Sequence, residues 1–437
     1  MKTFDGLNNA PKIHPFTEYW RRKFCSVRVT ASLLFVLLSL PTINASAADI
    51  TVLASFNGTD GSQSLSSLTA DSAGNLYGTT SRGGTNNQGT VFELPVGATQ
   101  VTTLVSFDNN NGSLPQAGLT ADAAGNLYGT TLGGGSNSTG TIYKIAAGTH
   151  QFTSLASFDG TNGHYPYAPL IADSAGNFYG TAYGGFGNDY GTVFQFSPTT
   201  NQITTLASFD INNGGFYPQA GLVADAAGNL YGTTKMGGSS GIGTVFELSA
   251  TTHQLTTLVS FNSANGANPT PEAGLIIDAQ GNLYGTTNQG GANNAGTVFE
   301  ILAGTHQLVT LATFDSTNGG YPFAGLIADA AGNLYGTTSQ GFGTVFKIAA
   351  GTHELSTLAT FNGTDGNGPY GSLIADAAGN LYGTTEIGGP NGFGTIYEVT
   401  GSGFVVPEVG AISMMSIAAM LGVGIQASRR LCQRRSR

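Results

Sequence analysis

Histidines are the first residues to consider for chemistry, because imidazole is a common general base and metal ligand. Four of the six occupy one repeated position, in the strings GTHQ, TTHQ, GTHQ and GTHE, at residues 150, 253, 306 and 353. In a ring of repeated units, equivalent outer turns diverge from the axis and cannot meet at one metal ion. His164 stands alone in the loop string DGTNGHYPY, and His14 lies far away near the N-terminus. The four repeated histidines are therefore predicted to be surface-turn residues.

Two further strings resemble catalytic or metal-binding motifs. GGSSG at 237–241 matches the nucleophile elbow, but that motif requires a strand-to-helix turn with a histidine and an acid in reach. Here it lies between two strand-like runs. DNNNG at 108–112 resembles a calcium loop, but it lacks the spaced acids and the terminal glutamate, so a tight Asx turn is favoured over structural calcium. The sequence predicts no catalytic residue, no metal site and no cofactor.

Cysteine content and charge exclude further classes. The two cysteines, Cys25 and Cys432, lie in the terminal segments, so residues 48–406 have no thiolate ligand, cysteine nucleophile or disulfide. The same residues hold four cations and 22 acids, a net charge of −18. Nucleic-acid binding requires a basic surface that neutralises phosphates, and electrostatic attachment to anionic lipid requires the same. Both kinds of binding are excluded.

The elements that would position any site come from one unit repeated seven times. The phrase ADSAGNLYGTT, beginning at Ala70, recurs with its aspartate at residues 71, 122, 173, 225, 278, 329 and 376. A period near 50 residues is typical of propellers and solenoid arrays. Each unit has four strand-like runs, here named a to d. In the second unit they span 118–122, 126–131, 140–145 and 152–158. Four antiparallel strands per unit of about 51 residues predict a propeller blade, since a β-helix rung uses roughly half that length.

The ends of the array favour a closed ring over an open solenoid. The array begins with an orphan d run, ITVLASF from residue 50, and its last unit ends after a c run, GTIYEV at 394–399. The orphan strand can therefore complete the last sheet, which pairs both open edges. The sequence predicts an all-β, seven-bladed β-propeller over residues 48–403, closed by its N-terminal strand. The repeated Asp-x-x-Gly-Asn is predicted to form the a–b turn, with a left-handed glycine and side chains bonded to local backbone.

The repeated phrase also carries a resemblance to a known family. The GNLYGTT phrase, repeated along residues 50–399, resembles the gloeo/verruco repeat family of bacterial exported proteins. The resemblance implies a propeller-like fold and a surface or extracellular location. It implies no established activity.

The first 47 residues predict a secretory signal peptide. Six cations precede an apolar run, ASLLFVLLSL at 31–40, and the small-residue site Ala45-Ser46-Ala47 follows. This order is typical of a signal peptide, with cleavage after Ala47. The apolar run is shorter than the roughly 20 residues that span a bilayer. A retained N-terminal anchor is the alternative.

Residues 404–437 predict a sorting segment. The apolar stretch 409–427 is long enough to cross a membrane as a helix, and an arginine-rich tail follows it. Together with a preceding Pro-Glu, this pattern resembles the PEP-CTERM signal of bacterial exported proteins, with Val409 in place of the usual second proline. The residues that carry the signal are Val406, Pro407, Glu408, Arg429 and Arg430.

The sorting resemblance implies partners and a location. After export through the secretion translocon, an exosortase-type enzyme would process the segment and deliver the protein to the cell envelope, cell surface or extracellular space. A permanent inner-membrane anchor at the C-terminus is the alternative. Membrane contact is expected only through this helix.

Binding sites are predicted where the units differ. In an antiparallel blade the d–a and b–c connections emerge at one edge, and these connections are long and variable. Variation on a fixed scaffold is where binding usually resides. Aromatic rings beside acids and amides suit neutral sugars, whose C–H faces stack and whose hydroxyls form hydrogen bonds. The alternative is that many of the rings fill space around the channel mouth. The predicted ligand-binding residues are Tyr165, Tyr167, Tyr183, Asp189, Tyr190, Tyr217, Tyr321 and Tyr370.

These observations predict an exported, surface-sorted propeller that binds or scaffolds and is not an enzyme. Its partner would be an extracellular polysaccharide or a surface protein. The alternative is a propeller enzyme, such as a lactonase or a glycan-active hydrolase or lyase that uses the channel mouth. An enzyme should break the repeat with acids, His or Arg converging on the axis, whereas the breaks here are loop aromatics and scattered acids. A structural matrix component without a specific ligand is a third interpretation.

Overall fold

A computed structural model describes residues 48–184, 190–210, 214–269 and 274–406. They belong to the larger of two compact units, which begins at residue 45. No helix within this described part is long and apolar enough to cross a membrane. The segments predicted as a signal peptide and a sorting helix lie outside the described residues, which end at Val406. Also outside lie Ala45, Ala47, Asp189, Pro407, Glu408, Arg429 and Arg430.

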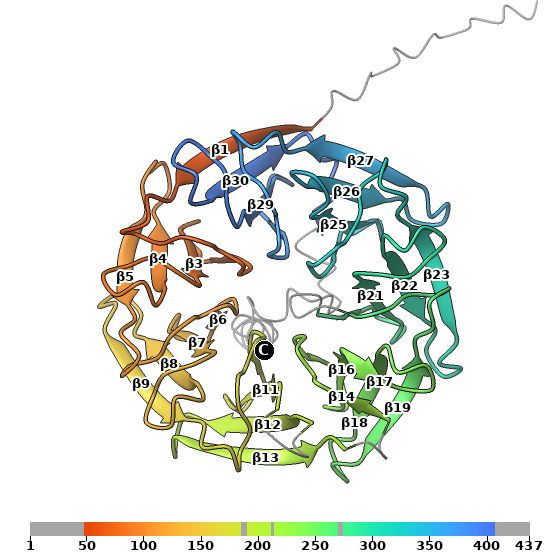
Figure 1. The fold of residues 1–437 in the computed structure, drawn as a ribbon, viewed down its shortest axis with the longest axis horizontal. Coiled ribbons are helices and arrows are strands. Elements are labelled where there is room, and N and C mark those ends of the chain that lie inside the picture. The colour runs from red at the N-terminus through yellow and green to blue at the C-terminus, as the bar shows by residue number, and fades with distance from the viewer. Residues whose placement is uncertain (1–47, 185–189, 211–213, 270–273, 407–437) are drawn as a thin grey trace, which may run out of the picture. The chain divides into compact units, whose positions relative to one another are not determined.

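Seven four-stranded antiparallel sheets stand around a central axis, which confirms the all-β, seven-bladed propeller (Figure 1). In blades 1 to 6 the strands follow chain order from a to d, and the d strands form the rim.

The strand bounds repeat closely from blade to blade. Blade 1 has β2 (Thr69–Ala70), β3 (Leu76–Thr80), β4 (Thr90–Leu94) and β5 (Thr102–Ser106). Blade 2 has β6 (Thr120–Ala121), β7 (Leu127–Thr131), β8 (Thr141–Ile145) and β9 (Phe152–Ser157). Blade 3 has β10 (Ile171–Ala172), β11 (Phe178–Ala182), β12 (Thr192–Ser197) and β13 (Gln202–Ser208). Blade 4 has β15 (Val223–Ala224), β16 (Leu230–Thr234), β18 (Thr244–Leu248) and β19 (Leu255–Ser260), with a small ribbon of β14 (Gly215–Phe216) and β17 (Met236–Gly237). Blade 5 has β20 (Ile276–Ile277), β21 (Leu283–Thr287), β22 (Thr297–Ile301) and β23 (Leu308–Thr313). Blade 6 has β24 (Ile327–Ala328), β25 (Leu334–Thr338), β26 (Thr344–Ile348) and β27 (Leu355–Thr360). Blade 7 has β28 (Ile374–Ala375), β29 (Leu381–Thr384), β30 (Thr395–Thr400) and β1 (Asp49–Ser55).

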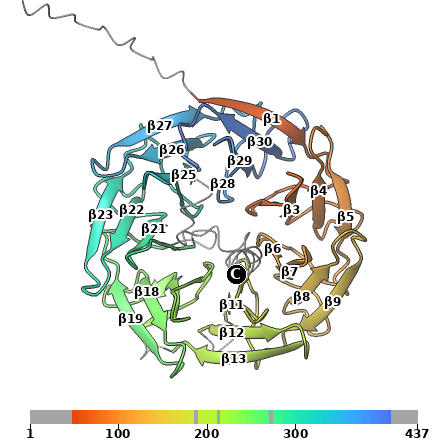
Figure 2. The same cartoon turned by 180° about the vertical axis from the view of Figure 1, so that it is seen from behind.

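The first strand closes the ring, as the sequence predicts. β1 runs antiparallel to β30, from the pair Asp49 and Thr400 to the pair Ser55 and Thr395. Figures 1 and 2 show β1 lying along the rim beside β30 from both sides. A second contact joins blade 7 to blade 1, where the Thr384 hydroxyl donates to the Ser66 carbonyl at 2.9 Å. The closure thus pairs the edge of the last sheet and leaves no open blade.

The innermost strands are much shorter than the sequence predicts. The a run predicted over 118–122 forms only the two-residue strand β6. The blades converge at the axis, and a Cβ atom on Gly118 would lie 3.0 Å from the carbonyl oxygen of Ser67 in blade 1. Because of this crowding at Gly118, the a strand pairs with the b strand only over Thr120 and Ala121.

Each b strand carries a glycine that makes room for an aromatic ring of the c strand. A Cβ atom on Gly232 would lie 2.7 Å from Cζ of Phe246 and 2.9 Å from Cδ2 of Leu222. Phe246 is buried, and Phe209, at the end of the preceding blade's d strand, packs edge-on against it at 5.0 Å. The same three-part contact recurs in all seven blades. GNLYGTT is therefore a packing motif that joins neighbouring blades.

One face of the ring, here named the constant face, carries the a–b and c–d turns. Asp225 Oδ1 accepts hydrogen bonds from the Ala227 and Asn229 N–H groups at 2.9 Å each. Its Oδ2 accepts from Asn229 Nδ2 at 2.9 Å and from the Tyr231 hydroxyl at 3.1 Å. Asn229 Oδ1 accepts in turn from Ala250 N–H in the c–d turn at 3.0 Å. The Asp–Asn part recurs in every blade, which confirms the turn role of the aspartates.

The opposite face, here named the variable face, carries the d–a and b–c loops. The two kinds of loop pair with each other, for example through Ser62 and Arg82 in blade 1 and through β14 and β17 in blade 4. The string 108–112 forms an Asx turn, since Asp108 and Asn111 each accept the other's backbone N–H at 3.0 Å. The GGSSG string occupies a b–c loop between strands, as predicted.

Candidate functional site

Four of the predicted tyrosines meet on the variable face, where the loops of blades 3 and 4 adjoin. The rings of Tyr183 and Tyr217 are stacked, with centroids 4.6 Å apart and planes 17° apart. Tyr167 meets Tyr183 edge-on at 5.6 Å, and Tyr190 lies 6.3 Å from Tyr217. Phe216 completes the group, 5.3 Å from Tyr190 and 5.2 Å from Tyr217. We name these five residues the aromatic cluster.

The remaining predicted site residues lie elsewhere. Tyr165 stacks on His164 at 5.8 Å. Tyr370 packs edge-on against Phe323 at 4.8 Å, between blades 6 and 7. Tyr321 is 37% exposed and makes no ring contact with another described residue. The structure therefore gathers four of the seven tyrosines and leaves three apart, and the position of Asp189 is outside the described residues.

The backbone takes the same left-handed conformation at one position of every blade. Residues 63, 114, 165, 217, 268, 321 and 368 all have a positive φ, between 50° and 69°. All but the first precede a proline. At Tyr217 the N–H donates to the Tyr190 carbonyl at 2.8 Å, and the Lys235 N–H donates to the Tyr217 carbonyl at 3.1 Å. These bonds hold a conformation that bulky residues rarely adopt.

At Tyr217, the following proline and a glycine of the preceding blade restrict this backbone position. Pro218 lies so close to Gly191, at the end of the preceding blade's b–c loop, that a Cβ atom there would be 2.5 Å from the proline Cδ. Gly191 also has a φ of 105°. The repeat thus fixes the backbone at this position, while the residue that occupies it differs among the blades.

Burial affects the ionisation of two tyrosines in the cluster. It raises the pKa of Tyr167, and the neighbouring Tyr183 and Tyr165 raise it further. Burial likewise raises the pKa of Tyr183, with a contribution from Tyr217. The hydroxyls of Tyr167 and Tyr183 therefore stay protonated at neutral pH. They can both donate and accept hydrogen bonds, while the half-buried rings offer partial faces to a ligand.

Two acidic groups on the variable face, Glu386 and Asp60, have a raised pKa. Burial raises the pKa of Glu386 in blade 7, and burial together with the charge of Glu386 raises the pKa of Tyr370. Burial also raises the pKa of Asp60, against hydrogen bonds from backbone N–H groups that lower it. No group of three His, Cys, Asp or Glu side chains is placed to hold a metal ion in the part of the chain that the structure describes.

Two buried amides on the variable face escaped the sequence analysis. Gln219 is 6% exposed and Asn288 is 8% exposed. The Gln219 Oε1 and Asn288 Nδ2 atoms have no hydrogen-bond partner among the described residues. Aligned on the repeat, they take the places of Tyr167 and Tyr183. That alignment was the signal that could have found them. Gln219 lies two residues after Tyr217 of the cluster, whereas Asn288 lies in blade 5.

The repeated histidines take no part in this site. His150, His253, His306 and His353 lie in the c–d turns of the constant face, with φ between 53° and 56°. Their predicted role as surface-turn residues is confirmed. His150 Nδ1 approaches Glu93 Oε2 of the neighbouring blade at 3.8 Å.

Comparison with known sequences identifies a family. The Gloeobacter/Verrucomicrobia repeat matches residues 40–227 and 211–397, which together span most of the chain. A search of curated protein sequences finds no significant match.

Solved structures share the fold at low sequence identity. A fungal alcohol oxidase of the AA5 family, in complex with copper, is 14% identical with a TM-score of 0.56, over 84% of this chain and 79% of its own. An oligogalacturonate lyase in complex with manganese is 10% identical with a TM-score of 0.54, over 83% of this chain and 94% of its own. The extracellular domain of a protein described as a one-component system of B. thetaiotaomicron is 13% identical, with a TM-score of 0.54, over 81% of this chain. This chain covers only 40% of that last protein. These likenesses show the propeller fold alone.

Proposed function

The chain belongs to the Gloeobacter/Verrucomicrobia repeat family, and from that premise we propose that it is an exported, surface-sorted binding module rather than an enzyme. The variable face binds a neutral extracellular polysaccharide through the aromatic cluster, and the rest of the ring acts as a rigid scaffold. The signal peptide directs the chain to the secretion translocon. The sorting segment, processed by an exosortase-type enzyme, directs it to the cell envelope or surface.

The observation that carries this proposal is the stacked pair of Tyr183 and Tyr217. The two rings come from different blades and lie 4.6 Å apart. The backbone of each is hydrogen-bonded to another loop, Tyr183 N–H to the Tyr165 carbonyl and Tyr217 N–H to the Tyr190 carbonyl, so little conformational entropy is lost when a ligand binds. Aromatic rings combine a large apolar face with a polar hydroxyl. A sugar ring presents the complementary surface, with C–H groups on its faces and hydroxyls at its edge.

Charge selects among polysaccharides. Residues 48–406 carry a net charge of −18, which repels acidic chains at long range. The protonated hydroxyls of Tyr167 and Tyr183 carry no charge at neutral pH. A neutral glycan is therefore the ligand that the face favours.

A glycan array probed with the full chain tests the proposal. We expect saturable binding to a neutral polysaccharide, lost at least tenfold in Tyr183→Ala and in Tyr217→Ala. Tyr321→Ala is the matched control, because Tyr321 has the same left-handed backbone and makes no ring contact with another described residue. The Tyr321→Ala variant should bind the polysaccharide as the wild type does. Chemical turnover of a glycan, or binding that survives both cluster substitutions, would refute the proposal.

A further inference from the structure

The residues that follow the last strand cross the constant face from blade 7 to blade 6. Ser402 Oγ donates to the carbonyl of Gly379, in the a–b turn of blade 7, at 2.9 Å. Further along, the Val405 N–H donates to Asp329 Oδ2 of blade 6 at 3.3 Å. The Ala330 N–H donates back to the Val405 carbonyl at 2.8 Å. Residues 402–405, which we name the C-terminal strap, therefore bind as a short peptide between two turns, with a left-handed glycine at Gly403, φ 69°.

Phe404 anchors the C-terminal strap between the blades. Its ring lies 5.1 Å from that of Tyr335 and packs against the hydrophobic cluster that includes Leu373 and Leu381. The Tyr335 hydroxyl lies 3.1 Å from the Gly403 carbonyl, to which it donates. One aromatic side chain and three backbone groups of the C-terminal strap are thus recognised.

The C-terminal strap changes the burial of the groove that it fills. Asp329 is only 1% exposed and Gly379 is buried. The equivalent Asp71 and Gly125 of the first two blades are exposed. The groove between blades 6 and 7 is therefore covered by the chain itself, and the groove between blades 1 and 2 is open.

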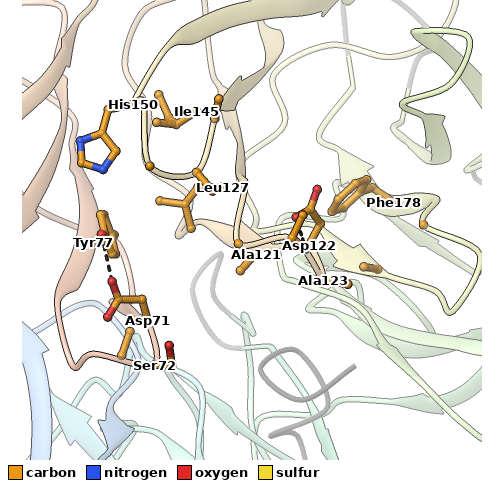
Figure 3. A pocket seen from close by; sticks show the side chains of 18 of the residues that line it. Asp71, Ser72, Tyr77, Ala121, Asp122, Ala123, Leu127, Ile145, His150 and Phe178 are labelled. Carbon is orange, nitrogen blue, oxygen red and sulfur yellow. Dashed lines mark hydrogen bonds between the residues drawn. The ribbon is translucent and has the colours of Figure 1, made fainter. Parts of the chain in front are cut away.

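A cavity of about 680 Å³ lies at the open groove and extends to blade 3. Figure 3 shows Asp71, Ser72 and Tyr77 along one side of it and Leu127 and Ile145 facing them. These residues are the repeat equivalents of Asp329, Ala330, Tyr335, Leu381 and Val399, which surround the C-terminal strap. A second cavity of about 520 Å³ occupies the same place between blades 7 and 1, beside Asp376 and Tyr382.

The open groove differs from the filled one at its rim. His150 holds the place of Phe404 in the repeat, and its ring lies farther from Tyr77, at 6.5 Å. The c–d turn of blade 2 folds back at that point, since the His150 N–H donates to the Ala146 carbonyl at 2.9 Å. Among the described residues, no segment takes the place of Val405 against Asp71 and Ser72.

We propose that the cavity of blades 1 to 3 binds a short segment of a partner protein with the pattern of the C-terminal strap: a small residue, an aromatic residue and an aliphatic residue. The partner's backbone would pair with Asp71 and the Ser72 N–H, and its aromatic ring would enter the cavity beside Tyr77 and Leu127. Asp71, Asp122 and Asp173 line the cavity, so the partner segment carries no acid. This proposal is independent of sugar binding, because it concerns the opposite face.

A fluorescently labelled peptide, Ser-Gly-Phe-Val-Val, tests the proposal when titrated with the full chain. We expect a saturable rise in anisotropy, weakened at least tenfold when the peptide phenylalanine is replaced by alanine. The Ser72→Pro plus Ala123→Pro variant should lose binding at least tenfold, since it removes two N–H donors at the cavity. Proline suits the second position of these turns, which are closed by bonds such as Gly74 N–H to the Asp71 carbonyl at 3.1 Å.

Two controls keep the test decisive. Ala279→Pro makes the same change in the turn of blade 5, which does not line the cavity, and should bind the peptide normally. Ala124→Trp blocks the cavity from an exposed turn position and should abolish binding even if the proline variant fails to fold. Peptide binding that is insensitive to Ala124→Trp, or no binding at all, would overturn the proposal. Self-association that the peptide reverses would also overturn it, because the occupant would then be a second copy of this chain.

Discussion

The two faces of the ring are built from the same seven units and use them in opposite ways. On the constant face, every aspartate accepts the same set of local hydrogen bonds, as Asp225 does from Ala227 and Asn229. On the variable face, the position held by Tyr217 carries tyrosine in blades 3 and 6 and glutamine, leucine, asparagine or glycine in the other four blades. Identical backbone thus supports identical side chains on one side and different ones on the other.

The constant face contributes mainly to the stability of the ring, and the variable face carries the side chains available for recognition. A turn bond repeated seven times contributes to stability seven times, so each copy is retained for the ring as a whole. A loop side chain that contacts nothing in the next blade can vary without affecting the ring. The aromatic cluster is the place on the variable face where several loop side chains contact one another across blades. The C-terminal strap is the corresponding exception on the constant face.

Acid is the largest expected perturbation of the constant face, because it acts on several turns at once. Burial raises the pKa of Asp71, Asp173 and Asp376, but hydrogen bonds from the following asparagine, backbone N–H groups and a tyrosine hydroxyl outweigh it and hold each pKa below its usual value. A lowered folded-state pKa stabilises the protein above the unfolded pKa near 4 and is lost as the pH falls through the folded value. We expect the melting temperature to drop steeply below about pH 4.

Circular dichroism melts between pH 7 and pH 2 measure this drop. The variant Asp376→Asn should melt lower than the wild type at pH 7 and approach it in acid. A melting temperature that stays level down to pH 2 would contradict the turn-bond account.

Asp225→Ala is expected to have the largest single-residue effect. The carboxylate accepts four hydrogen bonds, and its removal leaves the Asn229 and Tyr231 donors without their acceptor. Losing charged hydrogen bonds of this kind costs roughly 3 kcal/mol of unfolding free energy. Urea denaturation measures the change. Asp315→Ala is the control from the variable face, where the carboxylate is exposed and serves only Thr317 and Asn318, and its effect should be clearly smaller.

The fold was predictable because the repeat encodes it locally. The spacing of the aspartates set the blade count, and the orphan d run before residue 56 located the closing strand that pairs with β30. The short a strands were not predictable, since they result from crowding between Gly118 and Ser67 of the preceding blade. The role of the GNLYGTT glycine also stayed hidden, because its partner ring lies on another strand.

The candidate site was predictable only in part. The loop positions of the tyrosines followed from the repeat, but the meeting of Tyr183 with Tyr217 depends on the spacing between blades in three dimensions. The C-terminal strap left no signal at all. Val405 contacts Asp329 across 76 residues, and no second copy of that contact exists among the described residues to reveal a pattern.

Tyr143→Phe tests a residue that differs between blades in the buried core rather than on either face. Five blades have phenylalanine at this c-strand position, and blades 2 and 7 have Tyr143 and Tyr397. The Tyr143 hydroxyl is fully buried without a hydrogen-bond partner among the described residues, and burial raises its pKa. Removing it should stabilise the protein by about 1 kcal/mol in urea denaturation. The reverse change, Phe246→Tyr, should destabilise it; a stabilising result there would refute the account.

Glu386→Gln should show the opposite sign from the constant-face carboxylates. Burial raises the pKa of Glu386, so its ionised form destabilises the folded state at neutral pH, and the penalty disappears as the pH falls below the unfolded value. The amide variant should therefore melt slightly higher than the wild type at pH 7 and equal to it near pH 4. A lower melting temperature at pH 7 would instead mean that the carboxylate stabilises its loop.

Tyr321→Gly is expected to have the smallest effect and gives the sharpest measure of the aromatic cluster. Glycine relieves the left-handed backbone, φ 54°, but it adds entropy to the unfolded chain, and the two terms of about 1 kcal/mol offset each other. Tyr217→Gly makes the same backbone change at φ 61° and also removes the ring contacts with Tyr183, Tyr190 and Phe216. It should cost roughly 1–2 kcal/mol more in urea denaturation, since each aromatic pair contributes about 0.5–1.5 kcal/mol. Equal effects of the two substitutions would mean that the rings of the cluster do not pack together in solution, and the binding surface proposed for the variable face would lose its basis.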